Sequence, residues 1–240
     1  MALVKIPLSH GEQMVVEQLG LLQKGPVEMQ VLGPEAIEWV VQYIKWRQEH
    51  DYDCIVAITG REGEGKSTLA AHLVWRLGLR TPEVCFTGKE LVRRLEELPP
   101  KQVLWYDEVV EGMYTRDAMT RLNKILAKIF TAGRILGHVI IICLPRLMDL
   151  DVGVRRRVII WLHTYTISGR RGWADVYISR EKSPFAERGK ELRWDPQFVF
   201  RFHSFPHRGS PEEEAQKKFW SEYIQKKMAF VRSLLKSASD

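Results

Sequence analysis

Short apolar runs alternate with amphipathic segments from residue 35 to residue 144 of this chain. The apolar runs lack polar alternation, which is typical of strands buried on both faces of a sheet. The segments between them place apolar side chains at the spacing of one helix face. This alternation predicts an α/β fold in which helices cover a mainly parallel sheet. The predicted strands are residues 54–59, 84–86, 103–106 and 139–144, and the predicted helices are residues 35–50, 65–79, 88–98 and 117–136.

The pattern changes after Pro145. Residues 158–166 and 173–179 look like two strands, and the basic segment 167–172 between them predicts a β-hairpin with a positively charged tip. A long helix is expected from Pro211 onward, charged at first and then apolar. Residues 1–33 show little periodicity and are interpreted as an arm or an extra strand and turn. The expected organisation is an N-terminal arm (1–33), an α/β domain with the hairpin (34–210) and a C-terminal helix (211–240).

Composition places the chain among ordinary globular proteins. Its 240 residues are 45% hydrophobic, 10% aromatic and 28% charged, which excludes collagen-like and wholly disordered classes. No apolar run approaches the roughly 18 residues of a membrane span, and no secretory signal is evident. Cys54, Cys85 and Cys143 lie in apolar runs without CxxC spacing, so buried reduced thiols are expected. A cytoplasmic protein, in the host cell if the chain is viral, is the corresponding expectation.

The segment after the first apolar run fits the motif GxxxxGK[ST] at every required position. A buried strand before it and a helix after it are the context that this phosphate-binding loop requires. Lys66 is expected to reach the β- and γ-phosphates of ATP, Ser67 to ligate Mg²⁺, and Thr68 to contact the α-phosphate. The candidate nucleotide-binding residues are Gly60, Arg61, Glu62, Gly63, Glu64, Gly65, Lys66, Ser67 and Thr68.

A second motif, two acids at the end of the strand 103–106, completes the candidate site. Ligands bind at the carboxyl ends of strands in open α/β sheets, which is where Asp107 and Glu108 fall. Asp107 is the expected Mg²⁺ partner, together with Ser67. Glu108 is the candidate catalytic residue that polarises the attacking water, with Lys66 stabilising the phosphates. Such an acid pair favours ATP hydrolysis over phosphotransfer to a small molecule.

The two motifs and their spacing resemble the P-loop ATPases of the additional-strand, catalytic-glutamate class. Residues 121–126 and 131–144, a helix with Gly133-Arg134 near its end and then an apolar strand, resemble the FtsK–HerA DNA motors. Residues 143–151 resemble the zonular-occludens-toxin-like ATPases of viruses and mobile elements. So does Phe205-Pro206 with the Trp-, Tyr- and Lys-rich helix after it.

The resemblance, which covers about residues 54–206, implies a three-layer, RecA-like P-loop NTPase fold. It also implies a homo-oligomer, as a ring, and DNA as the partner that is moved or packaged for a virus or mobile element. One departure concerns the strand that ends at Leu144-Pro145, where the motors have a Thr-Gln pair whose glutamine senses the γ-phosphate. Proline has no side chain for that role, so Arg146 or another residue must replace the glutamine, or coupling is looser.

Positive charge gathers after the second motif in a chain of net charge +6. Arg134 and Arg155 are candidates for completing a neighbouring subunit's site, because an arginine stabilises charge on a transferring phosphoryl group. Solubility, or pairing with Asp149 and Asp151, explains any single arginine equally well.

The predicted hairpin tip offers a second basic group. Arg170, Arg171 and Trp173 are candidate nucleic-acid contacts, through phosphate pairing and base stacking, although a solvated turn has the same composition. The aromatic residues of the final helix are expected in packing or subunit contact.

Two functions from different classes remain open at this point. One is an oligomeric ATPase that moves or packages DNA, and the other is an ATP-dependent assembly or partner-loading switch without DNA translocation. A nucleoside or metabolite kinase is disfavoured, because Glu108 argues for water as the acceptor and no acceptor motif is evident. Since part of the positive charge has a role between subunits, the DNA assignment depends mainly on the resemblance.

Overall fold

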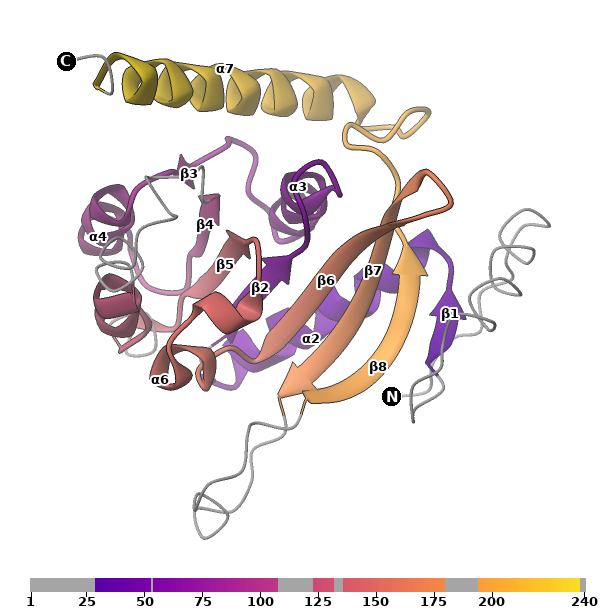
Figure 1. Ribbon diagram of the computed structural model, residues 1–240, viewed down its shortest axis with the longest axis horizontal. Coiled ribbons are helices and arrows are strands. Elements are labelled where there is room, and N and C mark those ends of the chain that lie inside the picture. The colour runs from indigo at the N-terminus through magenta and orange to yellow at the C-terminus, as the bar shows by residue number, and fades with distance from the viewer. Residues whose placement is uncertain (1–28, 53, 108–122, 132–135, 180–193, 238–240) are drawn as a thin grey trace, which may run out of the picture.

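A computed structural model of the chain describes residues 29–52, 54–107, 123–131, 136–179 and 194–237. Its centre is an eight-stranded sheet with the strand order β1-β8-β7-β6-β2-β5-β4-β3 (Figure 1). The strands are β1 (Gln30–Leu32), β2 (Cys54–Thr59), β3 (Val84–Cys85), β4 (Val103–Asp107), β5 (Val139–Leu144), β6 (Ile160–Ile167), β7 (Arg170–Ser179) and β8 (Trp194–Arg201). The helices are η1 (Pro34–Ala36), α2 (Ile37–Glu49), α3 (Lys66–Arg76), α4 (Gly88–Glu97), η2 (Leu147–Asp149), α6 (Val152–Arg155) and α7 (Glu213–Ser237), and residues 123–131 are also helical.

The sheet is mainly parallel, as the apolar runs predict. Strands β6, β2, β5, β4 and β3 pair in parallel in that order, and only β7 runs against its neighbours in the described sheet. Strand β5 is inserted between β2 and β4, with Ile55 opposite Ile140 and Leu104 opposite Ile140 on its other side. The two strands that carry the phosphate-loop and acidic motifs are therefore separated by one additional strand.

Helices cover both faces of this sheet, which confirms the predicted three-layer α/β architecture. Successive residues of one strand serve opposite faces: Val56 and Ile58 pack with α2, α3 and α7, whereas Ile55 and Ala57 pack with α4, the helical residues 123–131 and α6. All six residues of β2 and of β5 are buried. Because the middle strands have no solvent-facing side, their sequences carry no polar alternation.

The predicted hairpin is confirmed, and both of its strands belong to the central sheet. β6 and β7 pair along nearly their whole length, and β7 also pairs with β8. The turn is the two residues Ser168 and Gly169, both with positive φ, the backbone of a tight hairpin turn. The strands thus run further toward the turn than expected. The sequence pattern does not predict β8, and it indicates the parallel edge strand β1 only as one of two alternatives for residues 1–33.

Cys54, Cys85 and Cys143 are buried free thiols, as expected. Burial raises the pKa of the Cys143 thiol, which lies within the electrostatic reach of Asp107. Among the described residues, no helix combines the length and apolar character needed to cross a membrane.

Candidate functional site

The glycine-rich loop joins the end of β2 to the start of α3. Gly60 has φ +149°, and a Cβ placed there would lie 2.3 Å from Thr164 Oγ1, so no larger residue fits between the loop and β6. Gly65 has φ +98°, and a Cβ there would lie 3.0 Å from the Phe202 ring. Glycine at these two positions lets the loop curl tightly against the sheet. A tightly curled loop is what the phosphate-binding motif requires.

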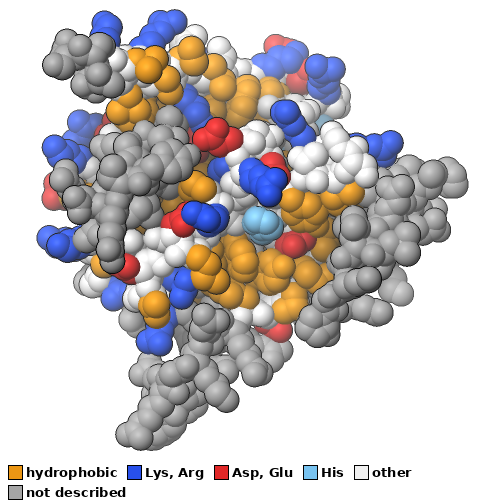
Figure 2. Space-filling model, viewed as in Figure 1, with side chains coloured by type: hydrophobic (Ala, Val, Ile, Leu, Met, Phe, Trp, Pro, Cys, Tyr) orange, Lys and Arg blue, Asp and Glu red, His pale blue; other side chains and the backbone are white. Residues whose placement is uncertain are grey.

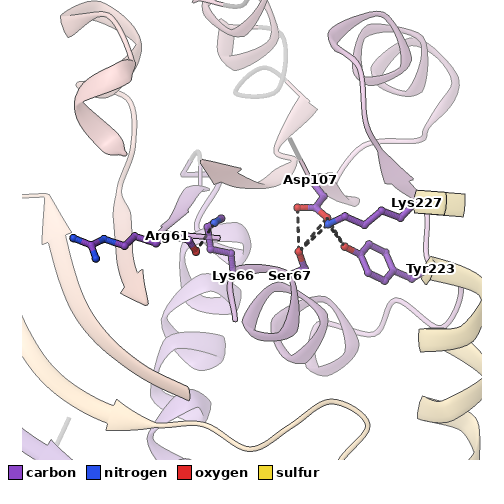
Figure 3. A network of polar contacts seen from close by, with 6 residues as sticks. All are labelled: Arg61, Lys66, Ser67, Asp107, Tyr223 and Lys227. Atoms are coloured by element: carbon purple, nitrogen blue, oxygen red, sulfur yellow. Dashed lines mark hydrogen bonds and ion pairs between the residues drawn. The ribbon is translucent and has the colours of Figure 1, made fainter. Parts of the chain in front are cut away.

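The side chains of Lys66 and Glu64 make polar contacts with the backbone of the loop. Lys66 Nζ donates hydrogen bonds to the carbonyl oxygens of Gly60 at 2.8 Å and Arg61 at 2.9 Å. The Glu64 carboxylate accepts a hydrogen bond of 2.5 Å from the Arg61 backbone N–H. The lysine ammonium is therefore held against the carbonyl groups of the loop (Figure 3).

Ser67 and Asp107 meet at the carboxyl ends of β2 and β4, as predicted. Ser67 Oγ lies 3.3 Å from Asp107 Oδ1 and 3.1 Å from Oδ2. Asp107 is 2% exposed, so its carboxylate is held in a place that water scarcely reaches. A hydroxyl and a carboxylate are the hard oxygen ligands that Mg²⁺ prefers, so this donor pair fits the expected metal.

Two residues of the C-terminal helix also reach this pair (Figure 3). The Tyr223 hydroxyl donates a hydrogen bond to Asp107 Oδ2. Lys227 Nζ lies 2.9 Å from the same oxygen, 2.8 Å from the Tyr223 hydroxyl and 3.4 Å from Ser67 Oγ. From the sequence, the aromatic residues of this helix are expected only in packing or subunit contact, and Lys227 is not singled out. The available signal is the four-residue spacing, which puts a lysine on the same helix face as a buried tyrosine.

A cleft of about 490 Å³ opens beside the loop. The face of the molecule in Figure 2 carries Lys and Arg side chains around a broad hydrophobic area. The loop residues Gly63, Gly65 and Thr68 form one side of the cleft. The other side comes from the sheet and the segment after β8, including Arg171 and His203. The volume lies within the range of small-molecule sites in proteins, roughly 300–1,000 Å³. The hollow therefore continues from the phosphate loop toward a basic wall.

A buried histidine links α3, the helix after the loop, to the segment after β8. His72, on α3, accepts a hydrogen bond from Arg76 Nη1 at 3.0 Å and contacts the His203 carbonyl at 3.0 Å through its other ring nitrogen. Burial is the main cause that lowers the pKa of His72 to about 4. The ring is therefore neutral near pH 7 and joins α3 to the segment that lines the cleft.

The remaining candidates are not gathered at this pair. Glu108 and Arg134 lie outside the described residues. Arg155 is half-exposed on α6 and its Nη1 lies 2.7 Å from Met148 Sδ. Arg146, the alternative sensor, is exposed and pairs with Asp149 at 3.4 Å. Asp149, an expected alternative partner for Arg134 or Arg155, thus pairs with Arg146.

Of the three candidate nucleic-acid contacts near the hairpin turn, the structure exposes two and buries the third. Arg170 and Arg171 are exposed beside the two-residue turn, as a polyanion contact requires. Trp173, however, is 1% exposed and packs with Ile167 and Val199, so its proposed role in base stacking is corrected. Arg171 and Trp173 share one face of β7, and Trp173 lies further along the strand, where it packs against Ile167 and Val199.

Comparison with known proteins does not assign this chain to a family. No family model and no curated protein match the chain. Among solved structures, the cytoplasmic domain of the Thermomonospora curvata type VII secretion ATPase EccC is similar, with 13% identity and a TM-score of 0.45. The match covers 70% of this chain but only 28% of that chain. A likeness at this level carries no argument about function, so the proposed function rests on the geometry of the site and on the sequence motifs.

Proposed function

We propose that this protein is a P-loop ATPase that binds ATP with Mg²⁺ and hydrolyses it. One observation carries the proposal: the buried carboxylate of Asp107 meets Ser67 at the start of the helix after the glycine loop. The complete loop motif and the acidic strand end are thus joined in one site. An α/β sheet with its ligand-binding groups at the strand carboxyl ends is the arrangement expected of nucleotide-binding proteins.

Each residue of the proposed site has a role that follows from its position. Backbone N–H groups of the loop and the N-terminus of α3 would hold the phosphates, and Lys66 would pair with the β- and γ-phosphate oxygens. Ser67 and Asp107 would hold Mg²⁺, which supplies charge neutralisation between the phosphates. Glu108 is the residue directly after Asp107 and would orient and polarise the attacking water. The cleft beside Thr68 offers room for the nucleoside.

We further propose that ATP turnover moves or packages DNA within a homo-oligomer, as in a virus or mobile element. Support comes from the sequence resemblance and from the exposed Arg170 and Arg171 at the hairpin turn. In this proposal Arg134 or Arg155 acts on a neighbouring subunit's site. The second candidate is an assembly or partner-loading switch. It is favoured by the burial of Trp173, which leaves the hairpin with charge but without an aromatic platform.

DNA-dependent ATPase activity separates the two candidates. The rate of phosphate release is measured with and without long double-stranded DNA over a series of salt concentrations. A motor predicts strong stimulation that falls steeply with salt, because phosphate contacts release counterions. Arg170→Ala should reduce that stimulation and leave the DNA-free rate unchanged; Arg171 is kept because it lines the cleft proposed for the nucleoside. A rate that ignores DNA at every salt concentration contradicts the motor and favours the switch.

A further inference from the structure

The helix α7 lies across the sheet on the side of α3 (Figure 1), and one aromatic stripe attaches it there. Phe219 and Tyr223 are each 1% exposed, and the Tyr223 ring stacks on Trp105 of β4 with centroids 4.8 Å apart. Phe230 stacks on Phe86 at 5.3 Å. The stripe therefore brings the middle of α7 directly over the end of β4, where Asp107 lies.

Lys227 places a positive charge between the two expected metal ligands. Its ammonium nitrogen is 2.9 Å from Asp107 Oδ2 and 3.4 Å from Ser67 Oγ. Figure 3 shows the lysine, the serine and the carboxylate converging on one point, with the Tyr223 hydroxyl as a further neighbour. A buried carboxylate needs a compensating charge, and Lys227 is the cation that supplies it here.

The ammonium and a magnesium ion cannot share this position. Mg²⁺ binds oxygen at about 2.0–2.1 Å with octahedral geometry and retains several waters. An ammonium in hydrogen-bond contact with both Asp107 and Ser67 takes up the space and the lone pairs that such coordination needs. Only one of the two cations can occupy this position at a time. The coupling is reciprocal, so Lys227 in the position weakens metal binding and a bound metal weakens the contacts of Lys227.

We propose that α7 is an autoinhibitory cap whose Lys227 is an internal cation that competes with Mg²⁺ for Ser67 and Asp107. This inference rests on the proposed function only in naming Mg²⁺ as the competitor. Metal binding withdraws Lys227 and loosens the C-terminal half of α7, from Tyr223 onward. The position of the helix then reports whether the site holds its metal, and a partner that draws α7 away favours loading.

The competition is tested first with metal alone, so that the result does not depend on nucleotide. Free Mn²⁺, a paramagnetic substitute for Mg²⁺, is measured by electron paramagnetic resonance during titration of the full chain. Lys227→Met removes the ammonium and keeps the stem, and it should tighten Mn²⁺ binding at least about fivefold. Lys218→Met, at an exposed lysine of the same helix, is the matched control and should leave Mn²⁺ affinity unchanged. Equal or weaker Mn²⁺ binding by Lys227→Met overturns the proposal.

A second measurement uses the unmodified chain. Amide hydrogen exchange over residues 223–237 is compared in EDTA and with Mg²⁺ and a non-hydrolysable ATP analogue. Faster exchange with metal and analogue supports the cap, and unchanged or slower exchange overturns it. The proposed function fails separately, if a fluorescent ATP analogue does not bind the chain in EDTA or in Mg²⁺. The Mn²⁺ result stands in either case, because no nucleotide enters that titration.

Discussion

The Ser67 hydroxyl donates to the Asp107 carboxylate, at 3.1 Å from Oδ2, and so joins two residues that are 40 positions apart in the chain. The bond joins the start of α3, which follows β2, to the end of β4, and β5 lies between β2 and β4 in the sheet. The serine lies in the first turn of a helix whose N-terminus carries partial positive charge, and the aspartate is buried at a strand end. Phosphate binding and metal binding thereby fall within one proposed site.

Lys66→Ala should abolish productive ATP binding. The ammonium now donates to the carbonyl groups of Gly60 and Arg61, at 2.8 and 2.9 Å, and would transfer those bonds to phosphate oxygens. Loss of two charge-assisted hydrogen bonds, about 3 kcal/mol together, corresponds to a roughly 100-fold weaker affinity. Titration with a fluorescent ATP analogue measures it. Lys89→Ala, at an exposed lysine of α4, should bind like the parent chain, and equal affinity in both variants would remove Lys66 from the site.

Gly60→Ala should destabilise the folded chain by about 3 kcal/mol, because the new methyl group meets both Thr164 Oγ1 at 2.3 Å and the Thr164 carbonyl at 2.4 Å. Gly63→Ala is the matched control: its φ is +78°, but no atom lies within 4 Å of the added Cβ. Its cost should be about 1 kcal/mol, from backbone strain alone. Urea unfolding monitored by circular dichroism compares the two. Equal losses would mean that the contact with β6 does not constrain the loop.

Much of the central fold can be predicted because its strands are short apolar runs that need both faces covered. The predicted strands 139–144 and 54–59 have the observed bounds of β5 and β2. The edge of the sheet is harder. β8 contains Pro196 and begins beyond a segment outside the described residues, and β1 has only the three residues Gln30–Leu32, too few for a clear period.

The site divides in the same way. Its loop and acidic end are local motifs, so Lys66, Ser67 and Asp107 can be identified from spacing alone. Tyr223 and Lys227 contact Asp107 across 116 and 120 positions, and no local pattern encodes so distant a contact. The burial of Trp173 depends on contacts with Ile167 and with Val199 of β8, a strand that the sequence pattern does not predict.

Lowering the pH should lower the free energy of unfolding, because His72 is buried as a neutral ring. Its pKa falls from 6.5 to about 4 in the folded chain because of burial, so the unfolded chain binds more protons between these values. The stability from the neutral ring is fully present above about pH 6.5 and is lost as the pH falls toward 4. The loss from His72 between about pH 7.5 and 5 is about 2 kcal/mol. Urea unfolding should show a smaller pH dependence for His72→Gln, and an unchanged slope would contradict this assignment.

If neighbouring subunits share catalytic sites, mixing two inactive variants should restore ATPase activity. Chains with Lys66→Ala lack phosphate binding and chains with Arg155→Ala lack the donated arginine, so each should be inactive alone. In a mixed oligomer about one quarter of the interfaces combine an intact loop with an intact arginine. ATPase activity of the mixture should therefore recover to about that fraction. The same mixing with Arg134→Ala decides which arginine acts, and a mixture no more active than its parts in both cases argues against shared sites.

Phosphate release from Mg²⁺·ATP by the purified chain tests the central claim most directly. The unmodified chain should turn over ATP. Lys66→Ala should bind it roughly 100-fold more weakly and not hydrolyse it, and Glu108→Gln should bind it while turnover falls by about 10²–10⁴-fold. Binding without turnover isolates the step in which water is activated. If the parent chain releases no phosphate with or without DNA, or if Glu108→Gln hydrolyses ATP at the parent rate, the proposed ATPase mechanism is contradicted.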